Sequence, residues 1–329
     1  MIATQSIWTP EQGWQSAAAS AASTSAQLVF VFGSRAHLAE GGLLAKLHER
    51  YPDAVLVGCS TAGEIAGARV LDESVVATAV AFEKTKVRCA SVPISAEGSR
   101  AAGRSLAVSL ADRELSHVLV FSEGLRVNGT ALVAGLMEAL PPGVQVTGGL
   151  SADGAAFRET CVLAENRWQS GWVTGVGLYG NSLRVGFGSL GGWDPFGPDR
   201  VITRSAGNVL YELDGRSALQ LYKTYLGSYA RSLPASGLLF PLLIHATPQD
   251  PGYVRTILSV DEATQSLTFA GDMPQGALAR LMKANFDRLI DGATGAARIT
   301  YEAIGRRPAA VALLISCIGR KLVLQQRTE

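Results

Sequence analysis

The sequence lacks the features that nucleic-acid and anionic membrane surfaces select. Its 29 Lys and Arg residues nearly balance 28 Asp and Glu residues, and no basic run exceeds two residues. Aromatic residues make up only 7% of the chain. Without a basic patch, nothing attracts the phosphates of a nucleic acid. With so few aromatic side chains, a surface on which bases stack is also unexpected. We therefore expect no nucleic-acid partner.

Export, zinc and membrane signals are also missing. The cysteines form no CxxC pair, which disfavours a zinc site; they are Cys59, Cys89, Cys161 and Cys317. The N-terminus has no basic segment followed by an apolar core, so it does not resemble a signal peptide. The apolar runs 238–246 and 309–318 are too short to span a bilayer. We expect a cytoplasmic protein with reduced thiols and no membrane insertion.

What is present is a globular composition over 329 residues, with 47% hydrophobic and 17% charged residues. That length predicts two domains. Strand patterns alternate with helical ones, which predicts an α/β fold with mixed sheets. The turn-rich stretch 191–200 separates a predicted N-terminal domain, 1–192, from a C-terminal domain, 193–329.

The N-terminal domain contains an internal repeat. Each copy has a strand, a helix, a strand that enters a glycine turn, and two further strands. The turns are GCSTAGE at 58–64 and GGLSADG at 148–154. Leu28 aligns with Val118 and Gly58 with Gly148, at the same spacing. We interpret the region as duplicated αβαβββ-type units at about 10–95 and 96–192.

Apolar patterns predict three further secondary-structure elements, one at the end of the second repeat and two in the second half of the chain. Residues 183–192 are expected to form a strand. An apolar stripe predicts a helix from Pro274, and 309–324 is expected to form a buried strand. That strand would begin a third unit with no turn after it, so we expect the C-terminal domain to be incomplete.

Both turns place hydroxyl and carboxylate groups at the ends of central strands, where α/β sheets often bind ligands. Glycine lets a backbone approach a ligand closely. The candidate ligand-binding residues from the turns are Cys59, Ser60, Thr61, Glu64, Gly148, Gly149, Ser151 and Asp153. The candidates from the second half are Trp193, Asp214 and Arg255, and Arg255 could hold a ligand carboxylate. Each could instead be structural, as turn glycine, packed tryptophan, turn aspartate or exposed arginine.

Catalysis is the competing interpretation. Cys59 lies at a strand-to-turn junction, where nucleophiles are often placed, and Glu64 and Asp153 could pair as acid and base. No histidine lies near Cys59 in the sequence, and Gly149 stands at the equivalent position of the second turn. GxGxxG and Walker patterns do not occur. We assign no catalytic residue and expect a binding protein.

Several segments together resemble the FIST family of sensory proteins. They are VGCSTAGEI, TGGLSAD, GWDPFGP, YELDGRSAL, LMKANFDRLIDGA and LLISCIGRKLVLQQR, in family order. The resemblance implies N- and C-terminal FIST domains, a cytoplasmic signal-input role and binding of a small ligand, with amino acids suggested. It also implies a partner such as a histidine kinase, a chemoreceptor or a cyclic-di-GMP enzyme. A ligand held between the turns would bridge both domains.

One subgroup of this family binds haem and senses nitric oxide. Many relatives have a histidine before the tryptophan of the GW motif, whereas Gly192 precedes Trp193 here. A haem would need another axial ligand, for which His245 is the best candidate. We therefore expect no metal and no cofactor, with haem held by His245 as the alternative.

Overall fold

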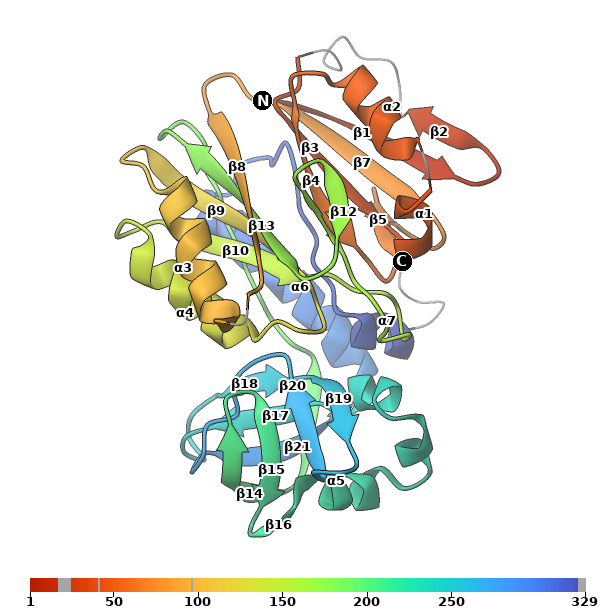
Figure 1. Ribbon diagram of the computed structural model, residues 1–329, viewed down its shortest axis with the longest axis vertical. Coiled ribbons are helices and arrows are strands. Elements are labelled where there is room, and N and C mark those ends of the chain that lie inside the picture. The colour runs from red at the N-terminus through yellow and green to blue at the C-terminus, as the bar shows by residue number, and fades with distance from the viewer. Residues whose placement is uncertain (17–24, 41, 96, 325–329) are drawn as a thin grey trace.

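The computed structural model describes residues 1–16, 25–40, 42–95 and 97–324. Two sheets in the N-terminal part pack face to face, with helices on their outer faces, and a third sheet lies beyond them (Figure 1). The contact between the first two sheets is apolar and includes Phe30 and Val57 of one sheet and Phe121 and Val176 of the other. The N-terminal part is therefore a four-layer αββα arrangement, as the near-continuous hydrophobic strands require.

The first sheet has the strand order β12-β11-β4-β3-β7-β1-β2. Its strands are β1 (Ile2–Thr9), β2 (Gly13–Ser16), β3 (Leu28–Gly33), β4 (Val55–Ser60), β7 (Val75–Ala81), β11 (Val162–Ala164) and β12 (Arg167–Gln169). Two helices accompany it, α1 (Arg35–Leu38) and α2 (Leu43–Arg50), and α2 buries Leu43 and Leu47. A separate hairpin, β5 (Glu64–Ala66) and β6 (Arg69–Leu71), follows β4.

The second sheet has the order β10-β9-β13-β8. Its strands are β8 (Lys86–Pro93), β9 (Leu115–Ser122), β10 (Gln145–Leu150) and β13 (Trp172–Tyr179). Helices α3 (Gly98–Leu110) and α4 (Gly129–Ala139) cover it, and Asn128 caps α4 by accepting from Ala131 N, as the sequence predicts. Strand β8 comes from the first repeat, whereas β11 and β12 of the first sheet come from the second. The two copies therefore exchange strands.

The repeat is visible in the strand pairing. Strand β3 pairs in parallel with β4 and antiparallel with β7, and β9 pairs in the same way with β10 and β13. The fold class predicted from the sequence is confirmed. One alignment shifts: Val31 lies opposite Gly58, but Val120 lies opposite Gly148, so the structural counterpart of Leu28 is His117 rather than Val118.

The third sheet is built from the second half of the chain, in the order β18-β17-β21-β14-β15-β20-β19, with β16 beside β15. Its strands are β14 (Trp193–Ala206), β15 (Val209–Leu213), β16 (Arg216–Ser217), β17 (Leu242–His245), β18 (Tyr253–Arg255), β19 (Ile257–Asp261), β20 (Ser266–Phe269) and β21 (Leu278–Ala284). Helix α5 (Ala218–Leu226), capped by Ser217 as predicted, packs on it. Two 3₁₀ segments follow, η2 (Gly227–Ser232) and η3 (Ala235–Leu239).

The last part of the chain returns to the N-terminal sheets. Helix α6 (Phe286–Ala303) leaves the third sheet, and the segment after it runs back beside the first two sheets (Figure 1). Val311 and Leu313 of that segment pack against the apolar contact between those sheets. Helix α7 (Ile318–Leu324) then lies at the junction between the N-terminal sheets and the third sheet (Figure 1).

Three element predictions are wrong. Residues 183–192 pair with no strand, because they pack closely along α6: a Cβ on Gly188 would lie 2.3 Å from the carbonyl oxygen of Ala296. Residues 278–284 form β21 instead of helix, since they pair with both β14 and β17. Residues 309–324 form an irregular segment followed by α7.

The turn-rich stretch 191–200 lies largely within β14, whose register shifts between Phe196 and Arg200.

Candidate functional site

The two predicted turns meet at one edge of the N-terminal sheets. The backbone N–H of Ala152 donates to the carbonyl oxygen of Ser60 over 2.8 Å. Ser60 is fully buried; its N–H donates to the carbonyl of Cys161 over 2.9 Å, and its hydroxyl accepts from the N–H of Cys161 over 3.1 Å. The structure therefore brings the turns together through direct backbone contact.

Most of the candidate polar groups in the turns serve the backbone. The Ser151 hydroxyl donates to the carbonyl of Ser122 over 2.9 Å. The Asp153 carboxylate accepts from the N–H groups of Phe157, Arg158 and Glu159. Groups held in this way shape the loops, since each would leave a backbone partner unsatisfied if it turned to a ligand.

The glycines flanking the turns permit close strand approach. A Cβ at Gly58 would lie 1.7 Å from the carbonyl oxygen of Val31, and one at Gly148 would lie 1.9 Å from that of Val120. Gly149 is different, because its nearest neighbour is a side-chain methyl carbon of Ile315 at 3.0 Å. Gly58 and Gly148 are therefore needed for strand packing in both copies.

Cys59 lies on the inner face of β4 and is 6% exposed. Burial, with a smaller effect from Cys161, raises the pKa of its thiol to about 12. A nucleophilic cysteine needs a lowered pKa and a neighbouring base. The surroundings of Cys59 raise the pKa of its thiol instead of lowering it. Cys59 therefore does not meet the requirements of a catalytic nucleophile.

Glu64 is the one buried acid at the end of the first turn. Its side chain is 2% exposed and accepts hydrogen bonds from the hydroxyls of Thr61, over 2.5 Å, and Ser74. Burial raises the pKa of this carboxyl, and the two hydroxyl donors and the charge of Lys321 partly offset that rise. Glu64 thus fixes the conformation of residues 61–64 from inside.

Lys321 of α7 reaches the outer side of the same turn. Its ammonium donates to the carbonyl oxygen of Ala62 over 2.8 Å and forms an ion pair with Asp72. The sequence interpretation missed Lys321 because it placed 309–324 in a buried strand. One signal in the sequence could have pointed to Lys321: it lies in LLISCIGRKLVLQQR, one of the segments that resemble the FIST family. We call the Ala62 carbonyl and the Asp72 carboxylate, with Glu64 behind them, the ammonium subsite.

Helix α7 also contacts η3, the start of β14 and the residues just before β14. Gly319 packs so closely that a Cβ there would lie 2.6 Å from the carbonyl oxygen of Leu238 and 3.3 Å from the ring of Trp193. Arg320 donates to the carbonyl of Leu190 over 3.3 Å. The position predicted for a ligand that bridges the turns and Trp193 therefore holds α7 of the chain itself.

Arg255 lies at a second contact between the N-terminal sheets with their helices and the third sheet. Its guanidinium donates to the Thr130 hydroxyl over 3.0 Å and to the carbonyl of Asp272 over 3.2 Å. Asn128 donates to the Asp272 carboxylate over 2.5 Å. Burial lowers the pKa of Arg255, which the nearby Tyr253 and Asp272 partly offset. The structure uses Arg255 to join α4 to the third sheet and does not bring it to either turn.

Asp214 is not near the turns either. Its carboxylate accepts from Arg200 over 2.9 Å and from the N–H of Val201 over 2.8 Å. The hydrogen bond from Arg200 is the main reason that the pKa of Asp214 is lowered. With φ at +51°, Asp214 occupies a turn position that aspartate tolerates better than most residues.

Both ring nitrogens of His245, the alternative axial haem ligand, face other groups. It is 4% exposed; its Nδ1 lies 2.7 Å from the carbonyl oxygen of Thr247 and its Nε2 lies 2.9 Å from Asp199. Binding of iron would have to break one of these contacts and open the site. The haem alternative stays a prediction. Within the described residues, no group of three or more His, Cys, Asp or Glu side chains could hold a metal ion.

Family models cover nearly the whole chain. A FIST N domain model matches residues 27–216, and a FIST C domain model matches residues 218–329. The chain belongs to the FIST family. It is therefore a sensory, signal-transduction protein, as the sequence resemblance predicts.

Other comparisons add little. The FIST chain is similar to a chorismatase crystal structure at 11% identity, over 86% of this chain and 98% of that chain, with a TM-score of 0.30. A likeness at that level carries no argument about chemistry. No curated protein matches the FIST chain. None of its described helices is long and apolar enough to cross a membrane.

Proposed function

We propose that this FIST protein senses a small molecule with a primary ammonium group, which binds at the ammonium subsite in place of Lys321. The observation that carries the proposal is the Lys321 ammonium on the Ala62 carbonyl and the Asp72 carboxylate. A backbone carbonyl and a carboxylate are acceptors for the three N–H donors of any primary ammonium. The subsite therefore has the donor–acceptor pattern and charge that an amine or amino acid requires.

The contact made by Lys321 is weak enough for a ligand to replace. Its side chain is 25% exposed and that of Asp72 is 70% exposed. Exposed ion pairs contribute about 1 kcal/mol or less, because water competes with both charges. Lys321 acts at the effective concentration of a tethered group, on the order of millimolar, so a ligand with additional contacts can displace it.

The ligand's second contact would come from Arg35. Arg35 begins α1 at the carboxyl end of β3, beside the turn whose Thr61 N–H donates to the carbonyl of Gly33 over 3.0 Å. Its Nη2 pairs with Glu159 over 2.9 Å, while its buried Nε has no hydrogen-bond partner among the described residues. An amino acid would place its ammonium on Asp72 and its carboxylate toward Arg35.

The signal would pass through α7. Displacing Lys321 removes the contact between α7 and the first turn, while the contact of Arg255 with Thr130 stays in place. The ligand then favours an arrangement in which α7 moves relative to the N-terminal sheets, and it does so only by its higher affinity for that arrangement. Such coupling is typically about 1–3 kcal/mol.

We place this sensor in the cytoplasm, where its cysteines stay reduced, and assign its output to a separate partner. Family membership supports that role. The partner would be a histidine kinase, a chemoreceptor or a cyclic-di-GMP enzyme, because the sequence contains no recognised kinase, cyclase or DNA-binding motif of its own. The raised pKa of Cys59 supports binding over catalysis as the function.

Calorimetric titration of the wild type and Lys321→Met with glycine, ethylamine and acetate tests the proposal. Met keeps the apolar stem and removes the competing ammonium, so we expect glycine and ethylamine to bind about fivefold more tightly to Lys321→Met. Lys46→Met, a change on the exposed side of α2, is the matched control and should bind as the wild type does. Equal affinities for the wild type and Lys321→Met, or binding of acetate alone, would contradict the proposal.

A further inference from the structure

A pocket in the third sheet lies under an arch of β14 and is separate from the ammonium subsite. The register of β14 shifts between Phe196 and Arg200, and Gly197 in between has φ at +74°. The released residues curve over buried side chains of the sheet and α5, among them Leu213, Leu221 and Leu242. The cavity volume is about 10 Å³, about enough for one water molecule.

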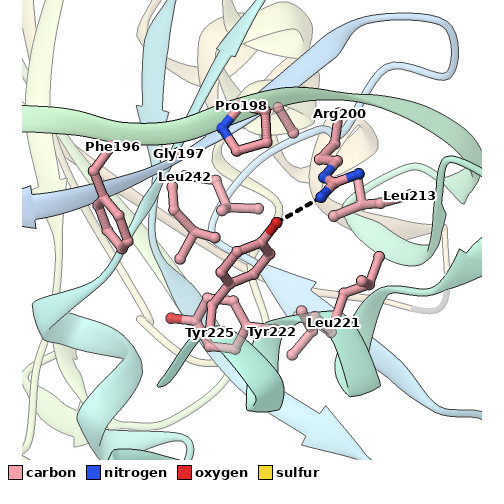
Figure 2. Close-up of a pocket in the computed structure, with 12 residues that line it drawn as sticks. Phe196, Gly197, Pro198, Arg200, Leu213, Leu221, Tyr222, Tyr225 and Leu242 are labelled. Atoms are coloured by element: carbon pink, nitrogen blue, oxygen red, sulfur yellow. Dashed lines mark hydrogen bonds between the residues drawn. The ribbon is translucent and has the colours of Figure 1, made fainter. Parts of the chain in front are cut away.

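Arg200 and Tyr225 border this pocket. The Tyr225 hydroxyl accepts from Nη2 of Arg200 over 2.7 Å, and Nη1 donates to Asp214 over 2.9 Å. Figure 2 shows the hydrogen bond between Arg200 and Tyr225, drawn as a dashed line, among the apolar side chains that line the pocket. Tyr225 is 37% exposed, near the end of α5, so its ring can turn toward solvent without crossing the core.

Of the two N–H donors on the edge of the Arg200 guanidinium that faces Tyr225, only one has a hydrogen-bond partner among the described residues. Nε and Nη2 of an arginine point the same way and together hold a carboxylate through two parallel hydrogen bonds. Arg280 uses this edge on Asp199, with Nε at 2.7 Å. In Arg200 the Nε is buried and has no hydrogen-bond partner among the described residues, while Nη2 has only the phenol. A buried donor without a partner is uncommon and costs free energy.

The local charge favours an anion. Asp214 pairs with Arg200, and the charge of Arg216 has a smaller effect in lowering the pKa of its carboxyl. Asp214 also keeps Arg200 in place, since its other oxygen accepts from the N–H of Val201. Among the residues that line the pocket, Arg200 is the charged one and none is an acid, so the charge that the lining favours is negative.

We propose that this pocket is a binding site for a small monocarboxylate with a compact apolar body. The carboxylate takes the Nε–Nη2 edge of Arg200, and the Tyr225 hydroxyl moves out. The apolar body occupies the space under the β14 arch against Leu213, Leu221 and Leu242, enlarged by the departure of the Tyr225 ring. This site is independent of the ammonium subsite and does not use Lys321.

Titration with benzoate, with benzamide as the neutral probe of the same shape, tests this site. In Tyr225→Phe no hydroxyl competes for Nη2 or ties the ring to Arg200, so the ring can leave more easily and benzoate should bind about fivefold more tightly than to the wild type. Tyr229→Phe, on an exposed tyrosine of η2, is the matched control and should leave the affinity unchanged. Arg200→Lys keeps the positive charge but removes the two-donor edge, and it should weaken binding at least about tenfold.

Three outcomes would overturn the proposal: benzoate does not bind, benzamide binds as well as benzoate, or Arg200→Lys leaves the affinity unchanged. Because Arg200→Lys also alters the Asp214 contact, its urea unfolding should be measured beside the titration. The Tyr225→Phe comparison keeps Arg200 and Asp214 intact and decides the case if Arg200→Lys fails to fold. Repeating the titration in Lys321→Met should give the wild-type affinity, which separates this site from the proposed function.

Discussion

The glycines beside the turns give the sharpest structural prediction. In Gly58→Ala the new Cβ would lie 1.7 Å from the carbonyl oxygen of Val31, a backbone atom that cannot rotate away. Strands β3 and β4 would have to separate where Val31 and Gly58 face each other in a parallel ladder. Each buried backbone group left unpaired costs about 1–3 kcal/mol, and overpacking adds about the same. We therefore expect Gly58→Ala to lose about 3–5 kcal/mol of unfolding free energy.

Urea unfolding followed by circular dichroism measures this loss. Gly148→Ala should lose a similar amount, because its Cβ would lie 1.9 Å from the carbonyl oxygen of Val120 in the second copy. Gly149→Ala is the matched control and should lose less than about 1 kcal/mol, since its nearest neighbour is a side-chain methyl of Ile315 rather than a backbone atom. If Gly58→Ala unfolds like the wild type but loses ligand binding, the glycine serves the ligand and the packing explanation is refuted.

Three further predictions concern single side chains. The folded protein holds the Glu64 proton more tightly than the unfolded chain does, because burial raises this pKa above 4.5. Thermal melts should therefore show wild-type stability falling as pH rises from about 4.5 through the raised pKa, and Glu64→Gln should remove that part of the slope. Arg255→Met should leave the Asp272 carbonyl without the Arg255 donor and the Thr130 hydroxyl with only the N–H of Asp272, and urea unfolding should show a loss of about 1–3 kcal/mol. Cys59→Ala should leave calorimetric binding of glycine unchanged; a loss of binding without loss of stability would return Cys59 to the ligand site.

Local chemistry explains what the sequence predicted well. Asn128 and Ser217 cap their helices through contacts to residues three positions away, so the signal and its effect lie in the same short segment. The repeat was visible because both copies keep a glycine where parallel strands approach most closely. The one-residue shift of β9 against β3 was not visible, because register depends on pairing between strands rather than on spacing along one chain.

Long-range contacts explain what was missed. The apolar pattern from 278 to 284 fits a helix as well as a strand, and pairing with β14 and β17 decides for the strand. Lys321 and Ala62 are 259 positions apart, so no local pattern joins them. The sequence marks Arg255 as a side chain that could hold a ligand carboxylate, but whether its partner is a ligand or Thr130 depends on how the N-terminal sheets and the third sheet meet.

The central claim is that a ligand ammonium replaces Lys321 and frees α7. Hydrogen–deuterium exchange of the wild-type protein, with and without saturating glycine, tests it most directly. We predict faster exchange in Ile318–Leu324 when glycine is bound, slower exchange at residues 61–64, and no change at residues 128–130, where α4 meets the third sheet. Slower or unchanged exchange in α7 with glycine bound would contradict the account.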